Sequence, residues 1–345
     1  MAYEREHERE YQTREEFSQL SSILAKGGTR ALVCFCVDVS ETMTYILHGQ
    51  DHKIDKRRSG ATSTVEGQVA NVVYALPGYT LENRLSKLND ILKSMLRRMQ
   101  KNPNLRDNAV ISIVTFAEDA DMKYSFLDVA LLDPNKYGEM AIARRAKQTS
   151  AGKALQLALQ EIEYAQSSFG DADVDLRTPT IIFLSDGEPT DNSRRDADIV
   201  NIGGHSVSND AASMAAEICR RVRENELNMV PVLIGEGNAQ ADSFMRSLTP
   251  ERTYRRMNTE RDYEEVFEMI EQTLAQRFMQ LVVDQNAHME ASVQLEARDA
   301  EKVTDTNSTG VKELSDSDMA SIFSGGAGNA FGGALAAEVE DDFLL

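Results

Sequence analysis

Four short apolar runs, separated by amphipathic patterns, are the feature that most limits how this chain can fold. The runs cover residues 31–37, 109–116, 179–184 and 229–234, a length typical of buried strands and too short for buried helices. Strands that lack an alternating polar face are typical of parallel sheets covered on both faces. Apolar residues at helical spacing predict the covering helices within residues 81–99, 155–162, 214–222 and 266–274. The sequence therefore predicts a three-layer α/β domain with a mainly parallel central sheet.

Composition adds an appendage at each end of this domain. Residues 1–28 carry a weak helical pattern that stops at a Gly pair, and they predict a solvated N-terminal leader helix. Residues 29–283 hold all four apolar runs and form the expected domain. Residues 284–345 contain 13 acidic and 3 basic residues and a Gly-rich stretch. This composition is typical of a flexible acidic tail.

One segment within the domain interrupts the alternation of strands and helices. Residues 47–79 have little periodicity and are rich in Gly, Ser and Thr, and they include the basic residues Lys53, Lys56, Arg57 and Arg58. A solvated loop is the simpler interpretation. The alternative is a loop that contacts a partner, so this insertion is a candidate for either role.

Charge and cysteine usage restrict the partners and the compartment. The chain has 37 Lys and Arg against 56 Asp and Glu, a formal net charge of −19 at pH 7. Nucleic acid and anionic lipid require a concentrated positive surface, so we expect neither as a partner. There is no apolar stretch of about 18 residues, and the N-terminus lacks the apolar core of a secretion signal. Cys34, Cys36 and Cys219 are odd in number, and we interpret them as buried reduced thiols in a cytoplasmic protein.

Oxygen-bearing side chains cluster where the predicted strands end. The first run is followed by Asp38, Ser40 and Thr42, and the third by Asp186. In open α/β sheets the carboxyl ends of the strands form the binding edge, so we expect these side chains to meet there. Hard oxygen donors suit Mg²⁺, Mn²⁺ or Ca²⁺ rather than Zn²⁺. Thr149, just before a predicted helix, is either the N-cap of that helix or a further oxygen ligand.

These motifs, in this order, resemble those of the von Willebrand factor A (vWA) domain. The matching features are a buried strand ending Asp-x-Ser-x-Thr, a helix start reading Thr-x-x-Gly-x-Ala-Leu, and a strand ending Asp-Gly, and the resemblance runs from about residue 30 to residue 278. It is greatest to bacterial cytosolic members of the TerY and YegL type, associated with tellurium resistance, in the segment Phe-Leu-Ser-Asp-Gly-Glu-Pro-Thr-Asp. The resemblance implies a Rossmann-like fold with one antiparallel edge strand. It also implies a metal-ion-dependent adhesion site (MIDAS) formed by Asp38, Ser40, Thr42, Thr149 and Asp186.

The resemblance implies a protein-binding function for this site. The hydroxyls of Ser40, Thr42 and Thr149 would coordinate the ion, while Asp38 and Asp186 would hold it largely through waters and hydrogen bonds. An Asp or Glu of a partner protein would complete the coordination. Thr42 stands where the family usually has Ser, and its hydroxyl offers the same donor oxygen. The partners implied are a kinase, phosphatase or AAA+ ATPase of a bacterial stress-response or defence system.

Enzymatic alternatives lack their required residues. A haloacid-dehalogenase-type phosphatase needs a second Asp two residues after the first, and Ser40 occupies that position. Neither a Gly-x-x-x-x-Gly-Lys phosphate loop nor a Gly-x-Ser-x-Gly nucleophile motif is present. The five histidines are scattered over the leader, the insertion, a loop and the tail, and no two of them lie on one predicted helix. We therefore expect a protein without catalytic activity.

Three further features have two interpretations each. Glu188 and Asp191 either build a turn around Pro189, which we favour, or tune the ion site. The acidic tail is either solubilising or supplies a carboxylate to the ion site of its own or a neighbouring molecule. For the whole protein, the alternative to an adaptor is a structural subunit of a self-assembling complex, in which the metal site and the tail mediate protomer contacts.

Overall fold

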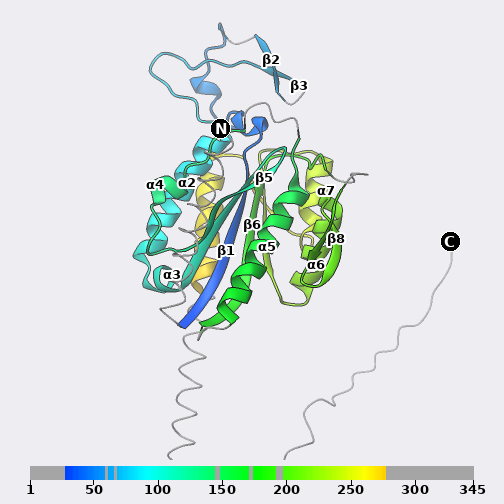
Figure 1. The fold of residues 1–345 in the computed structure, drawn as a ribbon. Coiled ribbons are helices and arrows are strands. Elements are labelled where there is room, and N and C mark those ends of the chain that lie inside the picture. The colour runs from blue at the N-terminus through cyan, green and yellow to red at the C-terminus, as the bar shows by residue number, and fades with distance from the viewer. Residues whose placement is uncertain are drawn as a thin grey trace, which may run out of the picture. The chain divides into compact units, whose positions relative to one another are not determined.

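The computed structural model describes residues 28–58, 61–65, 68–143, 148–170, 174–191 and 197–276 (Figure 1). The predicted leader helix, apart from Gly28, and the acidic tail lie outside these residues. Contacts divide the chain into two units, residues 1–282 and 283–345. Gly28 belongs to the first strand and not to the leader. No helix in the described part of the chain is long and apolar enough to cross a membrane.

The domain is built on one six-stranded sheet, as the apolar runs predict. Its strand order is β10-β9-β6-β1-β4-β5. In that order the bounds are Arg255–Met257, Asn228–Ile234, Val174–Ser185, Gly28–Asp38, Ala109–Phe116 and Ala120–Asp128. All neighbouring strands are parallel except β5, which pairs antiparallel with β4 at one edge. The four predicted strands are confirmed as β1, β4, β6 and β9, and so is the single antiparallel edge.

Helices cover both faces of the sheet and complete the three layers (Figure 1). One face packs against α2 and a helix over residues 260–276, and the other against α5, α6 and α7. Two short helices, α3 and α4, flank α2. The labelled helices are α2 (Arg84–Lys101), α3 (Pro103–Asn108), α4 (Pro134–Tyr137), α5 (Ala151–Gly170), α6 (Ala211–Arg223) and α7 (Ala239–Ser247). Each of the four helical patterns is confirmed, and the expected α/β sandwich with a mainly parallel sheet is correct.

Strand β1 shows how the two cores are separated. Its side chains alternate between the faces, so that Val33 and Phe35 enter one core while Cys34 and Cys36 enter the other. Both thiols are buried and free, as predicted. A hydrogen bond with Cys34, together with burial, raises the pKa of Cys36 well above its usual value, which makes its thiol inert. The prediction fails in part for Cys219, which is partly exposed.

The insertion, residues 47–79, contains regular secondary structure. It contains the 3₁₀ turn η2 (Asp51–Lys53) and a hairpin of β2 (Thr62–Val65) and β3 (Gln68–Asn71). Its two ends meet in a narrow neck, where Ile46 pairs with Asn83 and the buried Gln50 side chain exchanges hydrogen bonds of 2.8 and 3.1 Å with the backbone of Glu82. Low periodicity in the sequence concealed this hairpin and the pairing at the ends of the segment, while the choice between a solvated and a partner-contacting role stays a prediction. A second hairpin, β7 (Ile199–Ile202) with β8 (His205–Ser208), lies before α6.

Candidate metal centre

Two adjacent parallel strands bring the predicted site residues to one edge of the sheet. Strand β1 pairs with β6, with Val37 opposite Leu184, so Asp38 and Asp186 leave the sheet side by side. After Asp38 the chain enters the 3₁₀ turn η1 (Glu41–Thr44), which begins just after Ser40 and contains Thr42. Asp38, Ser40 and Asp186 are buried. The fold therefore places hydroxyls and carboxylates together, as expected from the carboxyl ends of parallel strands.

Hydrogen bonds join four of the five predicted residues. The backbone N–H of Ser40 donates to Asp38 Oδ1 at 2.9 Å. Thr42 Oγ1 donates to Asp186 Oδ1 at 2.8 Å and lies 3.0 Å from Ser40 Oγ. Because the single hydroxyl proton of Thr42 is used on Asp186, Ser40 is the donor to Thr42. Three oxygen atoms from Ser40, Thr42 and Asp186 thus form a continuous chain beside Asp38.

Ser185 is a member of this cluster that the sequence analysis missed. Its hydroxyl donates to Asp38 Oδ2 at 2.6 Å, so both carboxylate oxygens of Asp38 accept a hydrogen bond. It is the last residue of β6 and directly precedes Asp186. A Ser beside the strand-end Asp was the only available signal. Its role is to fix the Asp38 carboxylate, which lies within the protein rather than at its surface.

Arg84 is the second missed residue, and it carries the main positive charge of the site. Its Nη1 atom lies 2.5 Å from Asp186 Oδ2, with the Arg84 side chain 13% exposed and that of Asp186 fully buried. Arg84 is the first residue of α2, where a cation is disfavoured by the helix dipole. A lone Arg at a helix start was therefore a sequence signal that some nearby anion holds it. The anion is 102 residues away in the chain.

Arg84 is held through both its side chain and its backbone. The guanidinium lies over the Tyr45 ring, 5.3 Å from the ring centroid, and the Arg84 backbone N–H donates to the Tyr45 carbonyl at 3.0 Å. Gly235, with φ +82°, allows the guanidinium to approach closely, because a Cβ at that position would lie 2.4 Å from Nη2. The guanidinium is thus positioned by the fold as well as by its charge.

Thr149 lies at the same end of the sheet but is fixed through its backbone. Its N–H donates to Thr190 Oγ1 at 2.8 Å, and its carbonyl accepts from the Thr190 N–H at 3.0 Å. This pairing ties the buried Thr149 to the loop that follows Asp186. The residue directly before α5 is Ser150, not Thr149, and the N–H of Gly152 in the first turn donates to the Asp191 carboxylate at 2.9 Å. The N-cap interpretation of Thr149 is therefore wrong.

The acidic neighbours of the site have structural contacts. Asp191 is buried and supports the start of α5. Glu188 accepts a hydrogen bond of 3.3 Å from Asn238, the N-cap of α7. Glu41 is partly exposed in η1. For Glu188 and Asp191 the contacts favour the turn-building interpretation, extended to the support of two helices.

Burial of two carboxylates makes the site electrostatically demanding. Burial, together with the nearby charge of Asp186, raises the pKa of Asp38 to about 7 despite its hydrogen bonds to Ser185 and Ser40. Burial also raises the pKa of Asp186, and this is opposed by the Arg84 charge and by the Thr42 hydrogen bond. Because both carboxylates are buried and close together, the site favours additional positive charge. A further buried group, the Tyr263 hydroxyl, has no hydrogen-bond partner in the described part of the chain.

The donor set fits a hard divalent cation. Ser40, Thr42 and Asp186 offer hydroxyl and carboxylate oxygens within one hydrogen-bonded group, which is the chemistry that Mg²⁺ and Ca²⁺ prefer. Within the described residues no group of three or more His, Cys, Asp or Glu side chains could hold a metal. The cluster at the sheet edge instead combines two carboxylates, Asp38 and Asp186, with the hydroxyls of Ser40 and Thr42.

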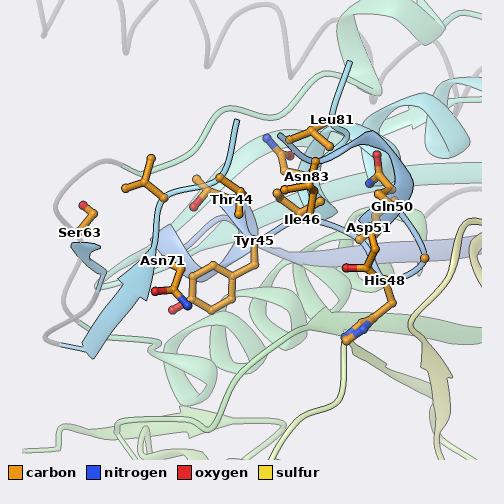
Figure 2. Close-up of a pocket in the computed structure, with 15 residues that line it drawn as sticks. Thr44, Tyr45, Ile46, His48, Gln50, Asp51, Ser63, Asn71, Leu81 and Asn83 are labelled. Carbon is orange, nitrogen blue, oxygen red and sulfur yellow. The ribbon is translucent and has the colours of Figure 1, made fainter. Parts of the chain in front are cut away.

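A groove adjoins the site on the side of the insertion. It has a volume of about 760 Å³ and is lined from both sides of the neck by residues that include Tyr45, His48 and Asn71. Figure 2 shows Ser63 and Asn71 of the insertion on one side of Tyr45, and His48 and Asp51 on the other. Because its lining residues Thr44 and Tyr45 lie two and three residues after Thr42, the groove begins beside the oxygen cluster.

Comparisons with known proteins give structural matches only. No protein-family model and no curated protein matches the sequence. Solved structures that align with this chain include proximal thread matrix protein 1 from the mussel byssus with a zinc-occupied MIDAS motif, at 15% identity over 72% of this chain and 46% of that chain, with a TM-score of 0.42. The pilus adhesin SpaC from Lactobacillus rhamnosus GG aligns at 12% identity over 72% and 31%, with a TM-score of 0.47. The protein BatB from Bacteroides thetaiotaomicron aligns at 13% identity over 71% and 98%, with a TM-score of 0.35. The chain spans less than half the length of the mussel and pilus proteins.

Proposed function

We propose that this protein is a metal-dependent protein-binding module of the vWA type. The observation that carries the proposal is the oxygen cluster at the ends of β1 and β6, where the Ser40 and Thr42 hydroxyls and the Asp186 carboxylate are hydrogen-bonded in series. A cation bound mainly by hydroxyl oxygens has few direct carboxylate ligands, so most of its positive charge is not neutralised. A residual positive charge at the surface of the domain is a binding site for a carboxylate of another protein.

Each residue of the proposed MIDAS has a distinct task. Ser40 and Thr42 would hold the ion through their hydroxyls, with Thr149 as the third hydroxyl from the neighbouring loop. Asp186 orients Thr42, and Asp38 fixes the turn that carries Ser40. A bound divalent ion would supply the positive charge that attracts a partner's Asp or Glu. Arg84 and Ser185 hold the two carboxylates in place.

The groove and the insertion are the surfaces on which the rest of a partner would bind. Tyr45 lines the groove and touches Arg84, so a partner that reaches the ion also meets the groove. Lys56, Arg57 and Arg58 are exposed on the insertion, and their charge favours an acidic partner segment. We extend the proposal to a cytoplasmic adaptor without catalysis of its own, of the TerY and YegL type, that serves a kinase, phosphatase or AAA+ ATPase in a bacterial stress-response or defence system.

Pulldown with the tagged full chain tests the proposal. The wild type and Asp38→Ala are used as bait in Mg²⁺ and in EDTA, with mass spectrometry of the proteins lost, and circular dichroism verifies that the variant is folded. Glu41→Gln, which removes a partly exposed carboxylate next to Ser40, is the matched control. We expect EDTA and Asp38→Ala each to remove the same partners, while Glu41→Gln retains them. Identical partners in all conditions would exclude a metal bridge.

Size-exclusion chromatography in the same two buffers separates the adaptor from a self-assembling subunit. An adaptor has the same elution volume in Mg²⁺ and in EDTA. A structural subunit whose protomers share the ion changes its elution volume on chelation. Deletion of residues 284–345 then shows whether the acidic tail supplies the carboxylate, since self-association through the tail would end with its removal.

A further inference from the structure

We propose that Arg84 is a built-in competitor of the divalent cation, whose guanidinium neutralises Asp186 in the metal-free chain and keeps the affinity of the site for the ion low. The inference rests on the proposed metal site and adds a residue to the five that the sequence analysis expected there. It assigns a role to the strongest ionic contact of the site, the 2.5 Å pair of Arg84 Nη1 with Asp186 Oδ2.

The contacts of Asp186 explain why Arg84 and an ion would compete. Oδ1 of Asp186 accepts from Thr42, and Oδ2 accepts from Arg84, so both oxygens of the carboxylate are engaged. An ion that draws on Asp186 must share it with a cation already hydrogen-bonded to it. Two positive charges close together in a buried site repel each other strongly, because the local dielectric constant is low.

Arg84 is held in this position by more than its charge. The Tyr45 ring on one side, the absence of a side chain at Gly235 and the hydrogen bond between the Arg84 N–H and the Tyr45 carbonyl all keep it near Asp186. A guanidinium with 13% exposure cannot leave for bulk water without losing this packing. Displacing it has a free-energy cost, which an incoming ion must offset.

The same geometry gives Arg84 a stabilising role when no ion is bound. Asp38 and Asp186 are two buried carboxylates at adjacent strand ends, and in the described part of the chain Arg84 is the only Lys or Arg that forms an ion pair with either of them. Removal of its charge leaves Asp186 without a cationic partner. The two effects have opposite signs: loss of Arg84 destabilises the metal-free chain and strengthens binding of the ion.

Mn²⁺ titration of the full chain at pH 8 tests this, because the electron paramagnetic resonance signal of free Mn²⁺ is lost on binding. The variants are Arg84→Gln and Arg84→Met; Met keeps an unbranched apolar side chain in place of the Arg stem, so that a folding defect of one variant does not decide the outcome. Arg98→Gln is the matched control, since Arg98 lies on the same helix and pairs with Glu271. We expect roughly tenfold or tighter Mn²⁺ binding in both Arg84 variants, the scale of a hydrogen bond between charged groups, and no change in Arg98→Gln.

Thermal unfolding in EDTA and in Mg²⁺ provides a second readout. In EDTA we expect the Arg84 variants to unfold at a lower temperature than the wild type. We expect Mg²⁺ to raise the unfolding temperature of the variants by more than it raises that of the wild type. Equal or weaker Mn²⁺ binding in the variants would overturn the inference while leaving the metal site intact. Failure of every variant and of the wild type to bind Mn²⁺ would overturn the proposed function and this inference together.

Discussion

We expect Asp38→Asn to make the stability of the metal-free domain less sensitive to a rise in pH from 5 to 8. The folded chain raises the pKa of Asp38 from 3.8 to about 7, mainly through burial and secondly through the charge of Asp186. The folded state therefore binds the Asp38 proton more tightly than the unfolded state, and the stability that this proton gives is lost as pH rises through about 7. Asn has no such proton to lose.

The shift in pKa sets the size of the effect. A difference of about 3 pKa units at about 1.4 kcal/mol per unit corresponds to about 4 kcal/mol in total, of which about 3 kcal/mol falls between pH 5 and pH 8. Asn fits the position, because its Oδ1 can still accept from the Ser40 N–H and its amide can donate to the Ser185 hydroxyl. The variant should thus gain about 3 kcal/mol relative to wild type over this range.

Urea unfolding in EDTA at several pH values measures this difference. Asp90→Asn, which removes an exposed carboxylate on α2, is the control and should follow the wild type at every pH. In Mg²⁺ at pH 8 we expect the ion to raise the free energy of unfolding of the wild type but not that of Asp38→Asn. A constant difference between Asp38→Asn and wild type from pH 5 to pH 8 would refute the reasoning.

Two further substitutions test the scaffold around the site. Gly152→Ala should destabilise the domain by about 1–3 kcal/mol in urea unfolding, because its Cβ would meet the Asn209 carbonyl oxygen at 2.3 Å; an unchanged midpoint would show that α5 can move away from this contact. Tyr263→Phe should leave the midpoint unchanged or raise it slightly, because it removes a buried hydroxyl without a partner in the described residues. A loss of about 1 kcal/mol or more would instead show that this hydroxyl is hydrogen-bonded in solution.

The strands and the main site residues could be predicted because their signals are local. A continuous apolar run identifies a strand buried on both faces, and the residue after it lies at the binding edge whatever the rest of the chain does. The family resemblance led us to expect one antiparallel edge strand but did not locate it, since the mixed burial of β5 gives no clear apolar run. Arg84 and Ser185 were missed because their partners, Asp186 and Asp38, lie 102 and 147 residues away. Such contacts follow from strand order, which no single segment encodes.

The neck of the insertion is a place where one segment of the domain can be exchanged for another. The Leu47 N–H donates to the Glu82 carbonyl at 3.2 Å, one residue beyond the pairing of Ile46 with Asn83, so the chain leaves the domain and returns to it at nearly the same place. Residues 48–81 could therefore be exchanged for a short β-turn, or for the corresponding segment of another protein, without moving Tyr45 or Arg84. Partner specificity, carried by the insertion, and ion binding, carried by the strand ends, can then be engineered separately. They can also diverge separately in related proteins.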